Sequence, residues 1–506
     1  MTPQQLSYPA WLKATARQCP GDVAVCDPTV SVSYAELSAV VDKVATAIRR
    51  RVEPGRPVAL AHTPSASFVA LFLGALASGA VPSVVNTKLT GPEVRAYLDV
   101  LDPALILHDS AHAALFAGCG RETLELPGLL ADTLEAQLAP LAQGTVAEPY
   151  RFPGEDAAAV VFPTGGTTGL PKGCWSTHRQ LLLWVWNLAV TGRRHRTEVE
   201  LFVGPFFHVS LVVGVLTPLF CGGTVVVENS YDPEHAASVV ARRRVTRLMG
   251  APVVLTGLIR AAGADRRVFE SVRNVGFGAS SWTDEFCELL CESFPDADIS
   301  AGYGATEFAG GVTQISPEAF RSRRFSGAGY PLPGCEVGIF DGDARRLPVG
   351  EVGDIGVRSP WQTMGYWNQP DETARTYGPD GFIRLGDIGY FDDTGWLYVS
   401  GRSKDMIVTG GENVFPAEVE RALAGLPGVR EVIAFGLPDS DWGERVEAVL
   451  TTAPGCGLSA AELRERVRDR LANYKVPKRI HIVDSIPSTV TGKPDRRAAQ
   501  RRFGPQ

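Results

Sequence analysis

The chain has 506 residues, of which 45% are hydrophobic, and a formal net charge of -7 at pH 7. This length exceeds one ordinary hydrophobic core, so we expect a large domain and at least one smaller domain. The negative charge argues against a broad surface for nucleic acid or anionic lipid, and any phosphate recognition must therefore be local.

Targeting segments and disulfides are not indicated. The nine cysteines are scattered and odd in number, which disfavours a disulfide framework. The first residues lack a basic segment followed by an apolar run, so we expect no secretory signal and a cytoplasmic location. Glycines and prolines interrupt the apolar stretches 68–85 and 201–227, which favours pieces of a buried core over membrane spans.

Short β-rich runs alternate with helical runs over the first two thirds of the chain. Residues 157–162 predict a buried strand, followed by a Gly/Thr loop and a helix over about 176–190. Residues 223–227 predict another strand, after which Asp232 and Pro233 supply the N-cap and the first-turn proline of a helix. Repeated alternation of this kind predicts an α/β fold of layered sheets.

After about residue 335 the pattern changes to shorter β-like pieces rich in glycine and aspartate, which indicate a β-rich subdomain of hairpins. A separate small unit follows, with a helix beginning near Pro416 and another opened at Ser459 by a capping box. We therefore expect an N-terminal domain over 1–403 and a mobile C-terminal α+β domain over 404–506.

A phosphate-binding loop is predicted over residues 163–173, which read PTGGTTGLPKG. Glycines let the backbone approach an anion closely, hydroxyls donate hydrogen bonds to it, and a lysine supplies positive charge. The residues with these properties are Thr164, Gly165, Gly166, Thr167, Thr168, Gly169 and Lys172. The alternative, a flexible surface turn, is disfavoured by the density of these residue types. We expect the loop to hold a triphosphate.

Two other nucleotide-binding motifs do not fit. The P-loop of NTPases needs Gly-Lys followed directly by Ser or Thr, whereas Pro171 precedes Lys172 and Gly173 follows it. The run that begins at Gly327 has Leu332 where the dinucleotide fingerprint needs its last glycine. The loop therefore belongs to neither motif class.

The loop closely resembles the phosphate-binding loop of the adenylate-forming superfamily, which includes acyl-CoA synthetases, peptide-synthetase adenylation domains and luciferases. Further motifs similar to those of the family follow in the family's order: PFFHVS from Pro205, GFGASSW from Gly276, GYGATE from Gly302, LGD from Leu385, GRSKD from Gly401, GGENVFPAEVE from Gly410 and TGK from Thr491. The resemblance covers nearly the whole chain and is closest to acyl- or aryl-CoA ligases. It implies ATP and coenzyme A as substrates and Mg²⁺ as a cofactor.

The resemblance implies roles for the GYGATE motif. Thr306 is expected to hydrogen-bond a phosphate, and Glu307 to help hold Mg²⁺, which needs hard oxygen ligands. Tyr303 is similar to the aromatic residue that stacks on adenine, and Gly304 follows it in the same motif.

Other motifs imply contacts with ribose and with the acyl group. Asp387 and Arg402 resemble the pair that binds the ribose hydroxyls, since a carboxylate accepts hydroxyl protons and a guanidinium donates. Gly278 and Ala279 resemble the strand end that lines the acyl and adenine sites. His208 resembles the histidine beside the acyl group, although a lone histidine in an apolar run is also often a core residue.

The small C-terminal domain is implied to act in both half-reactions. Lys493 in TGK is expected to be the main catalytic cation, stabilising charge on the phosphoryl oxygens as pyrophosphate leaves. Lys404 lies where the family has its interdomain hinge. A swing at this hinge would remove Lys493 and bring the glycine loop at Gly410 and Gly411 to the thiol.

These features predict an ATP-dependent carboxylate–CoA ligase that acts through acyl-AMP, releases AMP and pyrophosphate, and uses an aromatic or medium-sized apolar carboxylic acid. One alternative is an adenylation enzyme that passes the activated group to a carrier protein or another acceptor. Others are activation of an oxyanion such as nitrite, or a catalytically dead scaffold. The presence of all the charged candidate residues argues against the scaffold.

Overall fold

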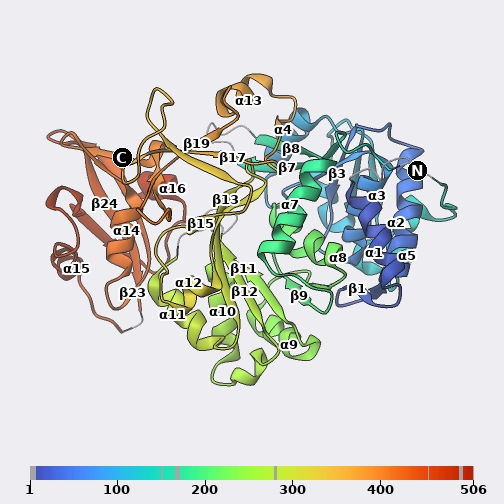
Figure 1. Cartoon of the computed structure of the whole chain (residues 1–506), viewed down its shortest axis with the longest axis horizontal. Helices are drawn as coiled ribbons and strands as arrows, with labels where there is room; N and C mark the ends of the chain where they lie inside the picture. Colours follow the sequence, from blue (N-terminus) through green and yellow to red (C-terminus); the bar gives the residue numbers. More distant parts are fainter. Residues whose placement is uncertain are drawn as a thin grey trace.

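The structure is a computed structural model that describes residues 7–149, 152–165, 171–278, 282–453, 455–488 and 494–504. Within these ranges the strands form four sheets, of nine, seven, four and five strands. Figure 1 places the amino-terminal helices at one end of the long axis and the carboxy-terminal unit, in orange and red, at the other. The predicted α/β class with layered sheets is confirmed.

The seven-stranded sheet has the order β18-β8-β7-β4-β3-β5-β6. Neighbours from β7 to β6 are parallel, whereas β8 and β18 are antiparallel to their neighbours. Every residue of β3 and β4 is buried, which explains their apolar sequences without polar alternation. The strands are β3 (Pro57–Ala61), β4 (Val81–Val84), β5 (Leu105–Asp109), β6 (Thr123–Leu126), β7 (Ala158–Gly165), β8 (Pro171–Thr177) and β18 (Gly365–Tyr366).

The nine-stranded sheet has the order β15-β14-β13-β12-β11-β9-β10-β1-β2. It is parallel from β13 to β1 and antiparallel at both edges. Its strands are β1 (Val23–Cys26), β2 (Ser31–Ser33), β9 (Val199–Phe202), β10 (Thr224–Val227), β11 (Arg247–Gly250), β12 (Asn274–Gly278), β13 (Asp298–Ala305), β14 (Gly310–Ile315) and β15 (Tyr330–Pro331).

Helices fill the space between the two large sheets, because one apolar core contains residues of both sheets and of these helices. They are α1 (Tyr8–Gln18), α2 (Tyr34–Arg49), α3 (Ala66–Ser78), α7 (His178–Thr191) and α8 (Thr217–Cys221). α3 is buried along its whole length, and Gly74 lets it approach α2, since a Cβ there would overlap Val44.

The outer faces of the sheets have their own cores. α4 (Gly91–Leu101) covers the seven-stranded sheet. The nine-stranded sheet is covered by α9 (Pro233–Arg243), α10 (Pro252–Ala262) and α11 (Asp284–Ser293). Shorter helices are α5 (Leu134–Gln137), α6 (Ala139–Ala142) and α12 (Pro317–Arg321).

Two smaller sheets follow along the chain. The four-stranded sheet contains β16 (Glu336–Phe340), β17 (Gly353–Arg358), β19 (Ile383–Phe391) and β20 (Leu397–Arg402). The carboxy-terminal unit has β21 (Ile407–Thr409), β22 (Glu412–Val414), β23 (Val429–Asp439), β24 (Gly443–Thr452) and β25 (Arg479–Ile482). α14 (Pro416–Ala424) and α15 (Ala460–Val467) cover one face of this last sheet, and α16 (Arg496–Phe503) covers the other.

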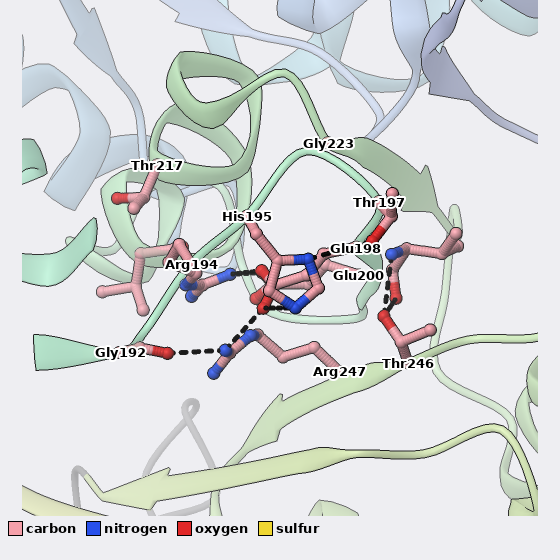
Figure 2. A network of polar contacts seen from close by, with 12 residues as sticks. Gly192, Arg194, His195, Thr197, Glu198, Glu200, Thr217, Gly223, Thr246 and Arg247 are labelled. Atoms are coloured by element: carbon pink, nitrogen blue, oxygen red, sulfur yellow. Dashed lines mark hydrogen bonds and ion pairs between the residues drawn. The ribbon is translucent and has the colours of Figure 1, made fainter. Parts of the chain in front are cut away.

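A buried network of charges joins the amino ends of β9 and β11 (Figure 2). Arg247 Nη2 lies 2.7 Å from Glu198 Oε1 and donates to the Gly192 carbonyl at 2.7 Å. Arg194 pairs with Glu200, and burial raises the pKa of the Glu200 carboxyl while the two arginines oppose that effect. The carboxyl end of β9 leads into the predicted acyl-site segment, so the network fixes the strands that support this segment.

Several local predictions are confirmed. Asp232 caps α9 by accepting a hydrogen bond from the His235 amide at 2.7 Å. Ser459 and Glu462 form the predicted capping box of α15. Among the described residues, each helix is too short or too polar to cross a membrane.

One prediction needs correction. The predicted phosphate loop does not pass directly into a helix, because 171–177 form β8 before α7 begins at His178. Pro171 is the first residue of this strand. Trp175 pairs with Gly365 of β18, and its ring packs edge-on against the ring of Trp367. Trp186 in α7 is exposed and lies edge-on to the ring of Trp11.

Candidate active site

The β7–β8 hairpin carries the predicted phosphate loop. Thr164 and Gly165 end β7 and pair with Lys172 and Pro171 at the start of β8. The remaining predicted loop residues lie outside the described ranges: Gly166, Thr167, Thr168 and Gly169. The hairpin register therefore places Lys172 opposite Thr164 at the base of the loop.

The Lys172 side chain is held between a carboxylate and an aromatic ring. Its Nζ lies 2.5 Å from Oε1 of Glu372, which belongs to α13 (Pro370–Thr376). The same ammonium lies 4.6 Å from the centroid of the Tyr366 ring. A cation over an aromatic face is attracted by the ring quadrupole. The lysine predicted to bind phosphate is thus fixed by two neighbours that are distant in sequence.

Thr306 and Glu307 lie in the turn between β13 and β14. Glu307 is buried, and its Oε1 accepts a hydrogen bond from the Tyr366 hydroxyl at 2.9 Å. Burial, and secondarily the Glu307 charge, raises the pKa of Tyr366 far above its usual value, so the phenol remains a donor. Tyr366 therefore connects Lys172 with Glu307, a carboxylate whose oxygens are the ligands that Mg²⁺ prefers.

A second cluster joins β13 to the four-stranded sheet. The Tyr303 hydroxyl donates to Asp387 Oδ2 at 2.7 Å, and Arg402 Nε donates to Asp387 Oδ1 at 2.9 Å. Asp387 and Arg402 face each other in the β19–β20 ladder. Burial and the Asp387 charge raise the pKa of Tyr303 well above its usual value. Each carboxylate oxygen has a further lone pair that can accept a hydroxyl proton.

Two predicted glycines sit where backbones approach closely. Gly278 ends β12 beside Gly302, and a Cβ on Gly278 would lie 2.8 Å from the Gly302 carbonyl oxygen. A Cβ on Gly304 would overlap the Gly310 carbonyl. Ala279 lies outside the described residues. Because these glycines have no side chain, the backbone at the carboxyl ends of β12 and β13 approaches neighbouring backbone closely beside the Tyr303 cluster.

His208 lies in the segment that follows β9. It is half-buried, whereas the preceding Phe206 and Phe207 are buried. Its Nδ1 accepts a hydrogen bond from the Ser210 amide at 3.3 Å. This leaves the role of His208 beside an acyl group a prediction.

Three of the residues predicted in the C-terminal domain lie in two turns. Lys404 lies in the turn η5 (Ser403–Asp405) between β20 and β21, and desolvation and the Arg402 charge lower its pKa. Gly410 and Gly411 join β21 to β22 with φ of 61° and 82°, which glycine adopts without strain. Lys493 lies outside the described residues.

Sequence reasoning missed Tyr366, Glu372 and Thr363. The Thr363 amide and hydroxyl both donate to the Glu307 carbonyl, at 3.1 and 2.8 Å, and so fix the turn. Pro370 followed by two acidic residues is typical of a helix start, and this local explanation hid the pairing of Glu372 with a lysine 200 positions away. The sequence around Tyr366 contains no comparable signal, because its two-residue strand forms only by pairing with β8.

Comparison with known proteins identifies the family. A model of the AMP-binding enzyme family matches residues 12–367, and a model of the AMP-binding enzyme C-terminal domain matches residues 418–493. A feruloyl-CoA synthase from Amycolatopsis sp is 32% identical over 502 residues, covering 98% of this chain and 99% of that protein. The fatty acid–[acyl-carrier-protein] ligase ScoC of Streptomyces coeruleorubidus is 31% identical over 490 residues, covering 94% and 92%.

A solved structure agrees with this result. ATP-bound MatB from Rhodopseudomonas palustris superposes with a TM-score of 0.89 at 27% identity, and the match covers 99% of both chains. The family models, the relatives and the fold agree with one another. The chain belongs to the AMP-binding enzyme family, and it is a ligase of the adenylate-forming superfamily.

Proposed function

We propose that the chain is an ATP-dependent carboxylate–CoA ligase that forms an acyl-AMP and then a thioester. The observation that carries the proposal is the meeting of two polar clusters at one motif, since Tyr303 contacts Asp387 and Glu307 contacts Tyr366. One cluster suits the hydroxyls of a ribose, and the other combines a cation with a metal-binding carboxylate. Together they suit ATP bound with Mg²⁺.

In the proposed first half-reaction, a carboxylate oxygen of the acid attacks the α-phosphorus of ATP and the bond to pyrophosphate breaks. No general base is needed, because a carboxylate is ionised at neutral pH. Lys172 and the loop hydroxyls are proposed to hold the β- and γ-phosphates, and Glu307 to hold Mg²⁺. Lys493 is proposed to face the α-phosphate, where a fixed cation stabilises the developing charge.

In the proposed second half-reaction, the thiol of CoA loses its proton to water and its sulfur attacks the acyl carbon. The carbon–oxygen bond of the mixed anhydride breaks, and AMP leaves with the bonding electrons. We propose that residues 404–506 turn against residues 1–403 at Lys404 between the two steps. Such a turn separates two reactions in one cleft, because it exchanges Lys493 for the turn at Gly410 and Gly411.

The surface beside the glycine turn supports CoA as the acceptor. The Gly410 amide donates to the Trp442 carbonyl at 2.8 Å, and the Trp442 side chain is exposed. Lys478 Nζ lies 4.8 Å from the centroid of the Trp442 ring. A half-exposed indole ring with an adjacent cation suits a base and a phosphate of a nucleotide, so we propose that the nucleotide end of CoA binds next to the turn.

We propose an aromatic or medium-sized apolar acid as the substrate. The support is the similarity to a feruloyl-CoA synthase and the apolar setting of His208 next to Phe206 and Phe207. A carrier protein is the second candidate acceptor. The observation that favours it is the 31% sequence identity to ScoC, which is close to the 32% identity to the feruloyl-CoA synthase. A carrier protein would not need the Trp442 surface for a nucleotide, so the two acceptors differ in their dependence on Trp442.

Lys493→Ala tests the proposed division of labour. The variant is expected to lose acyl-AMP formation from ATP and to keep thioester formation from supplied acyl-AMP, because the lysine acts only at the α-phosphate. Lys43→Ala, which removes an exposed lysine paired with Glu135, is the control and should change neither step. Equal loss in both half-reactions of Lys493→Ala would contradict the assignment.

Lys404→Pro tests the proposed hinge. Proline fixes φ and removes the amide donor at this position, so the turn between the domains should be hindered. The second half-reaction is expected to slow more than the first, measured by thioester and pyrophosphate formation under single-turnover conditions. The hinge assignment fails if both steps slow by the same factor.

A further inference from the structure

The Lys172 ammonium already has a carboxylate partner. The side chain of Lys172 is 8% exposed, that of Glu372 is 21% exposed, and their charged atoms lie 2.5 Å apart. The Lys172 hydrogen bond, the largest influence, lowers the pKa of Glu372, so this carboxyl is charged at neutral pH. α13, which carries Glu372, follows β18, and β18 pairs with β8, the strand that carries Lys172. Two adjacent elements thus form a short, half-buried ion pair.

Glu372 has a second cationic partner. Its Oε2 lies 2.9 Å from Nη2 of Arg375, one turn further along α13. The Arg375 side chain is 71% exposed, so it can follow Glu372 without breaking buried contacts. One carboxylate is therefore shared between a buried cation from the hairpin and an exposed cation from its own helix.

The charges of this group balance only as long as no anion arrives. Lys172 and Arg375 supply two positive charges, and Glu307 and Glu372 supply two negative charges. A triphosphate at Lys172 would place several negative charges next to the Glu372 carboxylate, and these like charges would repel one another. The carboxylate must then separate from Lys172, and Arg375 already contacts its other oxygen.

We propose that Glu372 competes with the triphosphate of ATP for Lys172, and that Arg375 holds Glu372 aside when ATP binds. This inference rests on the proposed function, in which Lys172 contacts the β- and γ-phosphates. Glu372 is then a positioning residue that acts through Lys172. It lowers the affinity of the chain for ATP and for pyrophosphate equally, and so favours release of pyrophosphate after the first half-reaction.

The test measures the Kd of the whole chain for MgATP and for Mg-pyrophosphate by calorimetry, without acid or CoA. Glu372→Gln keeps a hydrogen-bonding side chain but removes the charge, and it is expected to tighten both ligands about three- to tenfold. Arg375→Ala is expected to weaken both by about threefold. In the double variant the Arg375 effect should disappear, because no carboxylate remains to be held aside.

Two controls separate this from a general effect of charge or folding. Asp371→Asn removes an exposed carboxylate from the same helix turn, and it should leave both Kd values unchanged. Adenosine lacks phosphates, so its Kd should be the same for every variant. Thermal melting of each variant checks that α13 stays folded.

The outcomes distinguish the inference from the function on which it rests. Weaker or unchanged MgATP binding by Glu372→Gln, in a chain whose wild type binds MgATP, overturns the inference and leaves the proposed function standing. Persistence of the Arg375→Ala effect in the double variant also overturns it. A wild-type chain that binds no MgATP overturns both.

Discussion

The charge network around Arg247 provides a quantitative test of how the strands of the large domain are held. Arg247 and Glu198 are 6% and 1% exposed and lie 2.7 Å apart. Without the guanidinium, Glu198 keeps Arg194 at 3.7 Å, and Arg194 already pairs with Glu200. Because a buried carboxylate loses its best partner, Arg247→Met is expected to lower the free energy of unfolding by about 3–5 kcal/mol.

The assay is urea unfolding followed by tryptophan fluorescence. All tryptophans except Trp442 precede residue 404, so the signal reports the large domain. The midpoint should fall while the slope m stays constant. Arg244→Met is the matched control, since its pair with Glu270 spans 3.6 Å with side chains 72% and 62% exposed, and it should cost at most about 1 kcal/mol. Equal midpoints for the two variants would refute the reasoning.

Burial lowers the pKa of His178 to about 4, below its unfolded value near 6.5, so the unfolded state binds more protons and stability should fall by about 3 kcal/mol between pH 6.5 and pH 4. His178→Phe should flatten this dependence in urea titrations, and an unchanged slope would contradict it. Asp387→Asn should raise the KM for ATP about tenfold by weakening the contacts of Arg402 and ribose, whereas Asp393→Asn in an exposed turn should not. Trp442→Ala should raise the KM for CoA about tenfold without affecting pyrophosphate release in the absence of CoA. An unchanged KM would contradict binding of the CoA nucleotide at Trp442.

The sequence predicts those parts of the fold and site that depend on neighbours along the chain. The cap at Asp232 and the capping box at Ser459 need only residues three positions away. The layered α/β class follows from alternating strand and helix patterns, which are local as well. The contact of Asp387 with Arg402 could be expected because a hairpin joins their strands.

The parts that could not be predicted depend on residues brought together from distant segments. Nothing near Glu372 in the sequence indicates Lys172 as its partner. An acidic residue in the first turn of a helix is already explained by its favourable interaction with the positive end of the helix dipole. Tyr366 belongs to a two-residue edge strand that forms only by pairing with β8. The exposure of Trp186 likewise depends on where Trp11 packs, and helical periodicity does not contain that information.

The central claim is that the chain joins a carboxylic acid to CoA through acyl-AMP. The most direct test is ATP-dependent pyrophosphate release against a panel of aromatic and aliphatic acids, with and without CoA, with mass spectrometry of the products. Our account predicts release with an aromatic or medium-sized apolar acid, an increase on addition of CoA, and a thioester of the same acid. Release without any thioester would contradict CoA as the acceptor, and no release with any acid would contradict the proposed function.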